Sequence, residues 1–182
     1  MLRTLLVATA LAVSPMTAAL AHDGPHTAQA PAAGPTDAQI AHIAYTAGQL
    51  DIAAARQALE KSTNPQVRAF AELMARDHAA VNEQAVALVT RLHVTPADNP
   101  TSQALSQAAA ATHTRLAALD GAAFDAAYVA NEVAYHRTVN DALRTTLIPD
   151  ADNAELKSLL ETGLILFEAH QQHAEQLARD VH

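Results

Sequence analysis

Apolar residues recur at intervals of three and four along most of the chain, which is the spacing of one helical face. In the first such segment they are Ile40, Ile43, Ala47, Leu50, Ala54 and Ala58. Thr36 and Gln39 have the spacing of a capping box before this segment, and Asn64 followed by Pro65 is typical of the next helix start. The pattern predicts four long helices, near residues 37–61, 64–93, 122–147 and 153–180.

The connection between the second and third of these helices is long, whereas short links join the helices within each pair. It contains the loop VTPADNPTS and a shorter helix, near 101–118, rich in Ala, Gln and Ser. The chain has only 5 Gly and 8 Pro, and runs of β-branched residues are scarce. The sequence therefore predicts an all-α fold, a ferritin-like four-helix bundle with a short extra helix in the long crossover.

The N-terminus indicates export. Arg3 is followed by the apolar run LLVATALAV, and Ala19-Leu20-Ala21 has the small-x-small pattern of a signal-peptidase site. We predict a signal peptide at 1–21, a flexible tail at 22–35 and a helical domain at 36–182, in a periplasmic or outer-membrane-associated protein. An uncleaved anchor is the alternative, but the apolar run is short for a bilayer span, and no later segment is long and apolar enough.

Composition narrows the chemistry. The formal net charge is −8 and no basic patch carries interleaved aromatic residues, which disfavours nucleic acid as a partner. The chain has no cysteine, so disulfides and thiolate ligands are excluded. Any metal ion must therefore be held by nitrogen and oxygen ligands.

Histidines interrupt the apolar faces. His78 and His170 each occupy one position of an otherwise apolar seam, and His136 follows Glu132 by one turn beside the apolar side of its helix. Asp51 lies next to the alanine stripe of the first helix. At about 1.5 Å per residue, these positions all fall near the middle of the predicted bundle. We therefore take His78, His136, His170, Asp51 and Glu132 as candidate ligands of one transition-metal ion, Zn, Fe, Cu or Mn.

A second interpretation needs no metal. The same side chains could form a hydrogen-bonded polar cluster, or the histidines could reach the surface from the seam edges. A di-iron carboxylate site is disfavoured, because none of these histidines has a Glu three residues before it, as the Glu-x-x-His motif requires. No nucleophile triad, phosphate loop or nucleotide motif is present, so the sequence does not indicate an enzyme or an organic cofactor.

Three segments resemble the DUF4142 family of bacterial exported proteins: LDIAAARQALEKSTNPQVRAFAELMARDHAAVNEQ, LDGAAFDAAYVANEVAYH and FEAHQQHAEQLA. The most specific pieces are Met-x-x-Asp-His ending at His78, Gly-Ala-x-Phe-Asp beginning at Gly121, and the single histidines at 136 and 170. The family often has Glu at the position of Asp51. The resemblance implies a ferritin-like fold and export, and it makes the three histidines the positions to test.

The family's activity is undefined, so the resemblance supplies no reaction and two functions stay open. The first is an exported metal-binding bundle with a role in stress or metal handling. The second is a non-catalytic envelope protein, whose acidic, Ala-rich surface forms a homodimer or binds an envelope protein partner.

Overall fold

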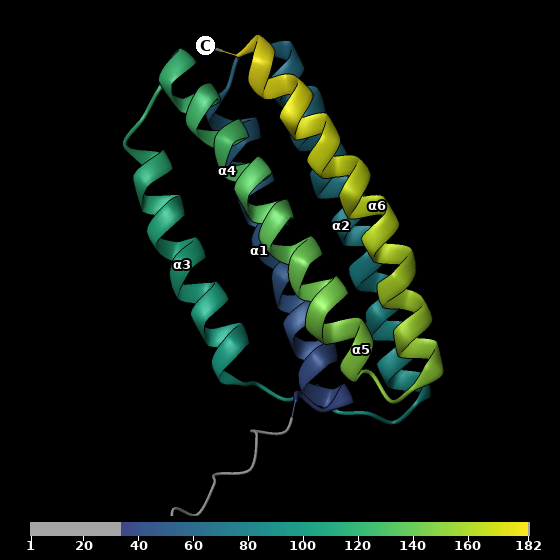
Figure 1. The fold of residues 1–182 in the computed structure, drawn as a ribbon. Coiled ribbons are helices and arrows are strands. Elements are labelled where there is room, and N and C mark those ends of the chain that lie inside the picture. Colours follow the sequence, from purple (N-terminus) through teal and green to yellow (C-terminus); the bar gives the residue numbers. More distant parts are fainter. Residues whose placement is uncertain (1–33, 182) are drawn as a thin grey trace, which may run out of the picture. The chain divides into compact units, whose positions relative to one another are not determined.

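The computed structural model describes residues 34–181, and all of the regular structure in that range is helical. It confirms the expected all-α bundle, with a fifth, shorter helix in the long connection (Figure 1). The signal peptide predicted at 1–21 and nearly all of the predicted tail lie outside the described residues. The five longest helices in this range are α1 (Asp37–Lys61), α2 (Pro65–Arg91), α3 (Pro100–Ala117), α4 (Gly121–Ala142) and α6 (Ala154–Asp180).

The four long helices pack in two consecutive pairs. Helix α1 lies along α2, and α4 lies along α6, while α2 also contacts α6 and α1 contacts α4. Helix α3 packs mainly against α1, on the outside of the four-helix core (Figure 1). Because α3 belongs to the connection between the pairs, this arrangement is the predicted bundle with a long crossover.

Local caps fix the helix starts. The backbone N–H of Thr36 donates to Oε1 of Gln39 at 3.0 Å, as the capping-box spacing predicts. Asn64 Oδ1 accepts from the backbone N–H of Gln66 at 2.9 Å, and Pro65 occupies the first helical position. These contacts are local in sequence, which is why the predicted boundaries agree closely with the observed ones.

The end of the third long helix is less regular than the predicted single segment at 122–147. The α-helical part ends at Ala142, a π-helical turn follows at Leu143–Leu147, and the short α5 covers Ile148–Asp150. Pro149 has no backbone N–H, and its ring would clash with the carbonyl four residues earlier in an α-helix. The wider turn relieves this crowding and still lets the N–H of Ile148 donate to the carbonyl of Leu143.

Two apolar clusters form the core, one toward each end of the bundle. One includes Phe70, Met74 and Phe124, and the other includes Ile40 and Phe167. Five of the buried polar residues lie at the level between the two clusters, and we call them the polar layer: Asp51, His78, Glu132, His136 and His170.

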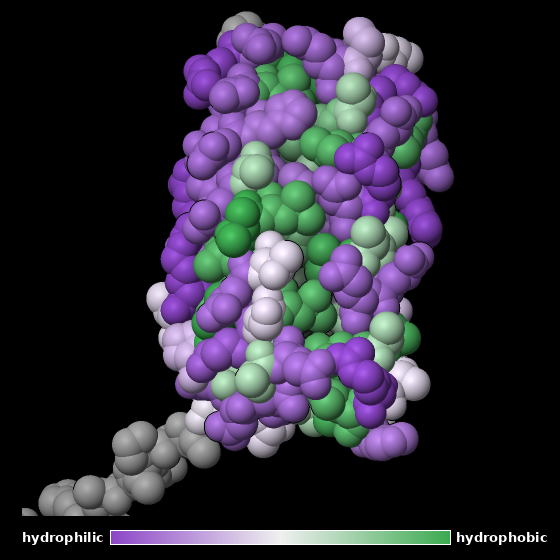
Figure 2. Space-filling view, turned by 90° about the vertical axis from the view of Figure 1, so that its right-hand side faces the viewer, coloured by the Kyte–Doolittle hydropathy of each residue, from purple (hydrophilic) through white to green (hydrophobic). Residues whose placement is uncertain are grey.

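The face formed by α2 and α6 is mostly hydrophilic, with apolar residues gathered in a band along it (Figure 2). Val86 and Ile165 are exposed large apolar residues on these two helices. Within residues 34–181, no helix combines the length and the apolar character that a membrane span requires.

Candidate metal centre

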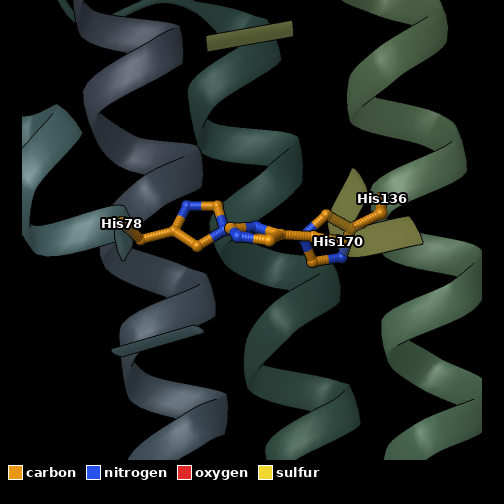
Figure 3. A group of neighbouring side chains, drawn as sticks. All are labelled: His78, His136 and His170. Atoms are coloured by element: carbon orange, nitrogen blue, oxygen red, sulfur yellow. The ribbon is translucent and has the colours of Figure 1, made fainter. Parts of the chain in front are cut away.

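The structure brings all five predicted ligand residues together at one level of the bundle. Asp51 comes from α1, His78 from α2, Glu132 and His136 from α4, and His170 from α6. All five are at most 3% exposed. Figure 3 shows the three imidazoles pointing toward one another from separate helices.

Three ligand-type atoms of the polar layer form a nearly equilateral triangle. Nε2 of His78 lies 3.4 Å from Nε2 of His136. Oδ2 of Asp51 lies 3.5 Å from Nε2 of His78 and 3.7 Å from Nε2 of His136. One ring nitrogen of each of His78, His136 and His170 lies within 4.8 Å of the others, so the third histidine borders the same point.

Hydrogen bonds orient two of the rings. Nε2 of His170 lies 3.0 Å from Oδ2 of Asp77, to which it donates, and this leaves Nδ1 of His170 with its lone pair free. Nδ1 of His136 lies 3.0 Å from the backbone carbonyl of Glu132, to which it donates, so Nε2 of His136 presents its lone pair to the triangle. Such bonds, from the ring nitrogen that does not bind the ion, are typical of metal-ligating histidines.

The two carboxyl groups of the polar layer, on Asp51 and Glu132, lie close together. Burial raises the pKa of Asp51 to about 7, although the neighbouring Glu132 carboxyl opposes this rise. Burial, followed by the nearby negative charge of Asp51, raises the pKa of Glu132 well above its usual value. Two buried carboxyls this close cannot both ionise, so one of them keeps its proton at neutral pH.

The imidazoles are neutral for a similar reason. Burial is the main cause that lowers the pKa of His78 well below its usual value, and the other two histidines lower it further. Burial also lowers the pKa of His136 to about 4. For His170, burial outweighs the opposing effect of Asp77, and the pKa is again lowered. Neutral imidazole is the form that binds metal ions.

Packing holds the rings in place. The ring of Phe167 stacks on that of His78, with centroids 4.6 Å apart and an interplanar angle of 7°. One turn beyond His136, Asn140 donates from Nδ2 to the carbonyl of Phe167 at 3.3 Å and to Gln171 at 3.0 Å. An apolar cavity of about 50 Å³ borders His78, His136 and Phe167 on the side of the second apolar cluster. The stacked ring of Phe167 therefore limits the rotation of the His78 imidazole.

Sequence reasoning missed Asp77 and Asn140. Asp77 is adjacent to His78 in the Met-x-x-Asp-His motif, but it serves His170 on another helix, and no local pattern specifies that partner. Asn140 follows His136 by four residues, so helical spacing could have placed it on the same inner face.

A family model described as "Domain of unknown function (DUF4142)" matches residues 23–177, which is most of the chain. The chain belongs to the DUF4142 family. This match confirms the resemblance seen in the sequence. A comparison with curated proteins found no match to the chain.

Two solved structures share the fold. One is a DUF305 protein from Streptomyces coelicolor, described as secreted, with 14% identity and a TM-score of 0.67, covering 79% of this chain and 92% of its own. The other is CopM in the Cu(II)-bound form, with 14% identity and a TM-score of 0.64, covering 82% of this chain and 99% of its own. At this identity the likeness concerns the fold alone.

Proposed function

We propose that this exported DUF4142 protein binds one divalent transition-metal ion through His78, His136, His170 and Asp51. The observation that carries the proposal is the triangle of 3.4, 3.5 and 3.7 Å between Nε2 of His78, Nε2 of His136 and Oδ2 of Asp51. Two atoms that each bind one tetrahedral ion at about 2.0–2.1 Å are about 3.3–3.4 Å apart. The three atoms are therefore spaced as ligands of one ion are spaced.

The hydrogen-bond pattern supports the same proposal. Both carboxylate oxygens of Asp51, and Nδ1 of His170, are buried without a hydrogen-bond partner among the described residues. A buried polar atom left in that state costs about 1–3 kcal/mol. A bound cation would be a partner for the Asp51 oxygens and for the lone pair of His170.

The ligand set restricts the choice of ion. Three imidazole nitrogens and one carboxylate oxygen suit Cu(II) and Zn(II), and Cu(II) stands at the top of the affinity series for divalent first-row metals. Fe(II) and Mn(II) bind such sites more weakly. The structural neighbour solved with Cu(II) is a further reason to test copper first.

The biological role that fits this centre is metal handling outside the cytoplasm, including protection under metal stress. The four proposed ligands come from four different helices, so a bound ion would tie the bundle together. Binding would then stabilise the fold in proportion to the occupancy of the site. Asp77 would orient His170, and Glu132 would stay protonated beside the ionised Asp51.

The test uses untagged protein stripped of metal by a chelator and then titrated separately with Cu(II), Zn(II), Fe(II) and Mn(II). We expect one ion per chain by elemental analysis and a Tm that rises with added Cu(II) or Zn(II). His170→Ala should abolish the rise. The matched control is His173→Ala, because His173 lies on the same helix and is exposed.

The metal-free polar cluster makes the opposite prediction. In that case no ion would change the Tm, and His170→Ala would only lower the free energy of unfolding, by about 1–3 kcal/mol. An envelope protein with a structural role would then be the better account. Metal binding that persists equally in His170→Ala would place the ion elsewhere on the chain and would refute this centre.

A further inference from the structure

A groove separates α3 from α1 and α4, and it leads to the carboxyl side of the polar layer. Its volume is about 620 Å³. Leu50, Ala54, Leu105 and Ala109 form apolar walls, while Asp51 and Glu132 line its inner end. This volume lies within the range of about 300–1,000 Å³ that is usual for small-molecule sites.

Four of the hydroxyl groups that line the groove already donate to backbone carbonyls of the protein. The hydroxyls of Ser106, Thr114 and Thr138 donate to backbone carbonyls one turn earlier in their own helices, at 2.9, 3.0 and 3.0 Å. The hydroxyl of Tyr135 donates to the carbonyl of Ala47 at 2.8 Å. These side chains therefore have no proton left to offer a ligand.

In contrast, several buried hydrogen-bond acceptors around the groove have no donor in the described part of the chain. Both carboxylate oxygens of Asp51, Oε2 of Glu132 and Oε1 of Gln57 have no hydrogen-bond donor among residues 34–181. These residues are 1%, 1% and 5% exposed, so a ligand in the groove reaches their oxygens only by displacing neighbouring side chains. A proton retained on one of the two carboxyls would satisfy at most one of these acceptor positions and would leave the others open.

We propose that this groove binds an organic primary amine, with its ammonium group on Asp51 and Glu132 and its apolar body between α1 and α3. An ammonium group has three donors and no acceptor, which matches a floor of acceptors without donors. Its charge strengthens each bond to a carboxylate. The net charge of −8 also raises the local concentration of cations near the protein.

Asp51 belongs both to this groove and to the triangle of the metal centre. A bound ion and a bound ammonium group would therefore compete for it, and each would weaken the other by the same factor. The groove does not need the ion, however, because its unpartnered acceptors exist in the metal-free protein. The two proposals can therefore fail separately.

The experiment titrates the full, metal-free chain with 2-phenylethylamine in the presence of a chelator, and follows binding by calorimetry. Two probes of similar shape serve as comparisons: 2-phenylethanol, which has one donor and no charge, and 3-phenylpropionate, whose head group is an anion. We expect the amine to bind at least about tenfold more tightly than the alcohol, and the carboxylate to show no binding.

Two variants locate the site. Ala109→Trp should fill the groove and abolish amine binding, while Ala111→Trp on the exposed side of α3 should leave it unchanged. Equal binding of amine and alcohol would overturn the proposed head-group recognition, and amine binding that survives Ala109→Trp would overturn the location. Because Ala109 is not part of the metal centre, its variant should keep the metal-dependent rise in Tm, which separates the two proposals.

Discussion

Glu132→Gln should stabilise the metal-free protein at neutral pH, although it alters a fully buried side chain. Glu132 is 1% exposed, and burial together with the charge of Asp51 raises its pKa well above the usual 4.5. The folded protein therefore keeps a proton that the unfolded chain releases as pH rises. Gln has nearly the same shape as the protonated acid and has no proton to lose.

The size of the effect follows from proton linkage. Above the usual pKa of 4.5, folded wild-type protein binds one more proton at this position than the unfolded chain does. Its free energy of unfolding then falls by about 1.4 kcal/mol per pH unit, until the pH reaches the raised pKa of the folded state. Relative to wild type, Glu132→Gln should therefore gain stability progressively as the pH rises from about 5 to about 7.

The assay is urea denaturation of both proteins with a chelator present, followed by circular dichroism at about pH 5, 6 and 7. Glu161→Gln is the matched control, because it makes the same chemical change at an exposed position of α6. A stability difference that stays constant with pH would refute the retention of this proton by Glu132. So would a variant that loses stability relative to wild type as pH rises.

Three further predictions concern the metal centre and its packing. Asp77→Asn should lower metal affinity about 10–100-fold, because the imidazole of His170 would lose the charged acceptor of its hydrogen bond. Calorimetric titration would check this, with Glu72→Gln on the same helix as the control. Metal affinity should weaken as pH falls below about 7, because burial raises the pKa of Asp51 to about 7 and a proton there competes with the ion; titrations across this range should show no change if Asp51 is not a ligand. Gly48→Ala should lower the free energy of unfolding by about 1–3 kcal/mol in a denaturation experiment, because the new Cβ would lie about 2.4 Å from Oδ1 of the buried Asn82. The cost of this steric overlap should exceed the gain from the better helix propensity of alanine.

Helix positions could be predicted well because their signals are local. The caps at Thr36 and Asn64 act within three residues, and the apolar spacing repeats along each helix. The buried face of α1 was predicted less well. Leu50 and Ala54 were placed in the core but are only half-buried and line the groove, whereas Ala55 is fully buried. The packing of α3 against α1 decides this difference, and periodicity within α1 does not contain it.

Two of the candidate ligands could be recognised from the sequence because they interrupt a local apolar pattern. A histidine in an apolar seam stands out by itself, so His78 and His170 were visible from spacing alone. Glu132 and His136 were placed at the edge of their helix's apolar side, yet they are buried while Tyr135 is only partly buried. Here two polar residues are buried and an aromatic residue is only partly buried, which is the reverse of the usual distribution. The sequence could therefore not reveal how deep Glu132 and His136 lie.

The polar layer costs stability that an apolar layer would not. It lies between two well-packed apolar clusters, and buried ionisable groups can often be replaced by apolar side chains without loss of stability, or with a gain. Nothing in the packing of the four helices requires a polar residue at this level. The bundle would hold together through the clusters at its two ends, and these offset the cost of the layer between them. The ligand-like spacing of its atoms and the unpartnered acceptors on its groove side are therefore the reasons for proposing a positively charged occupant.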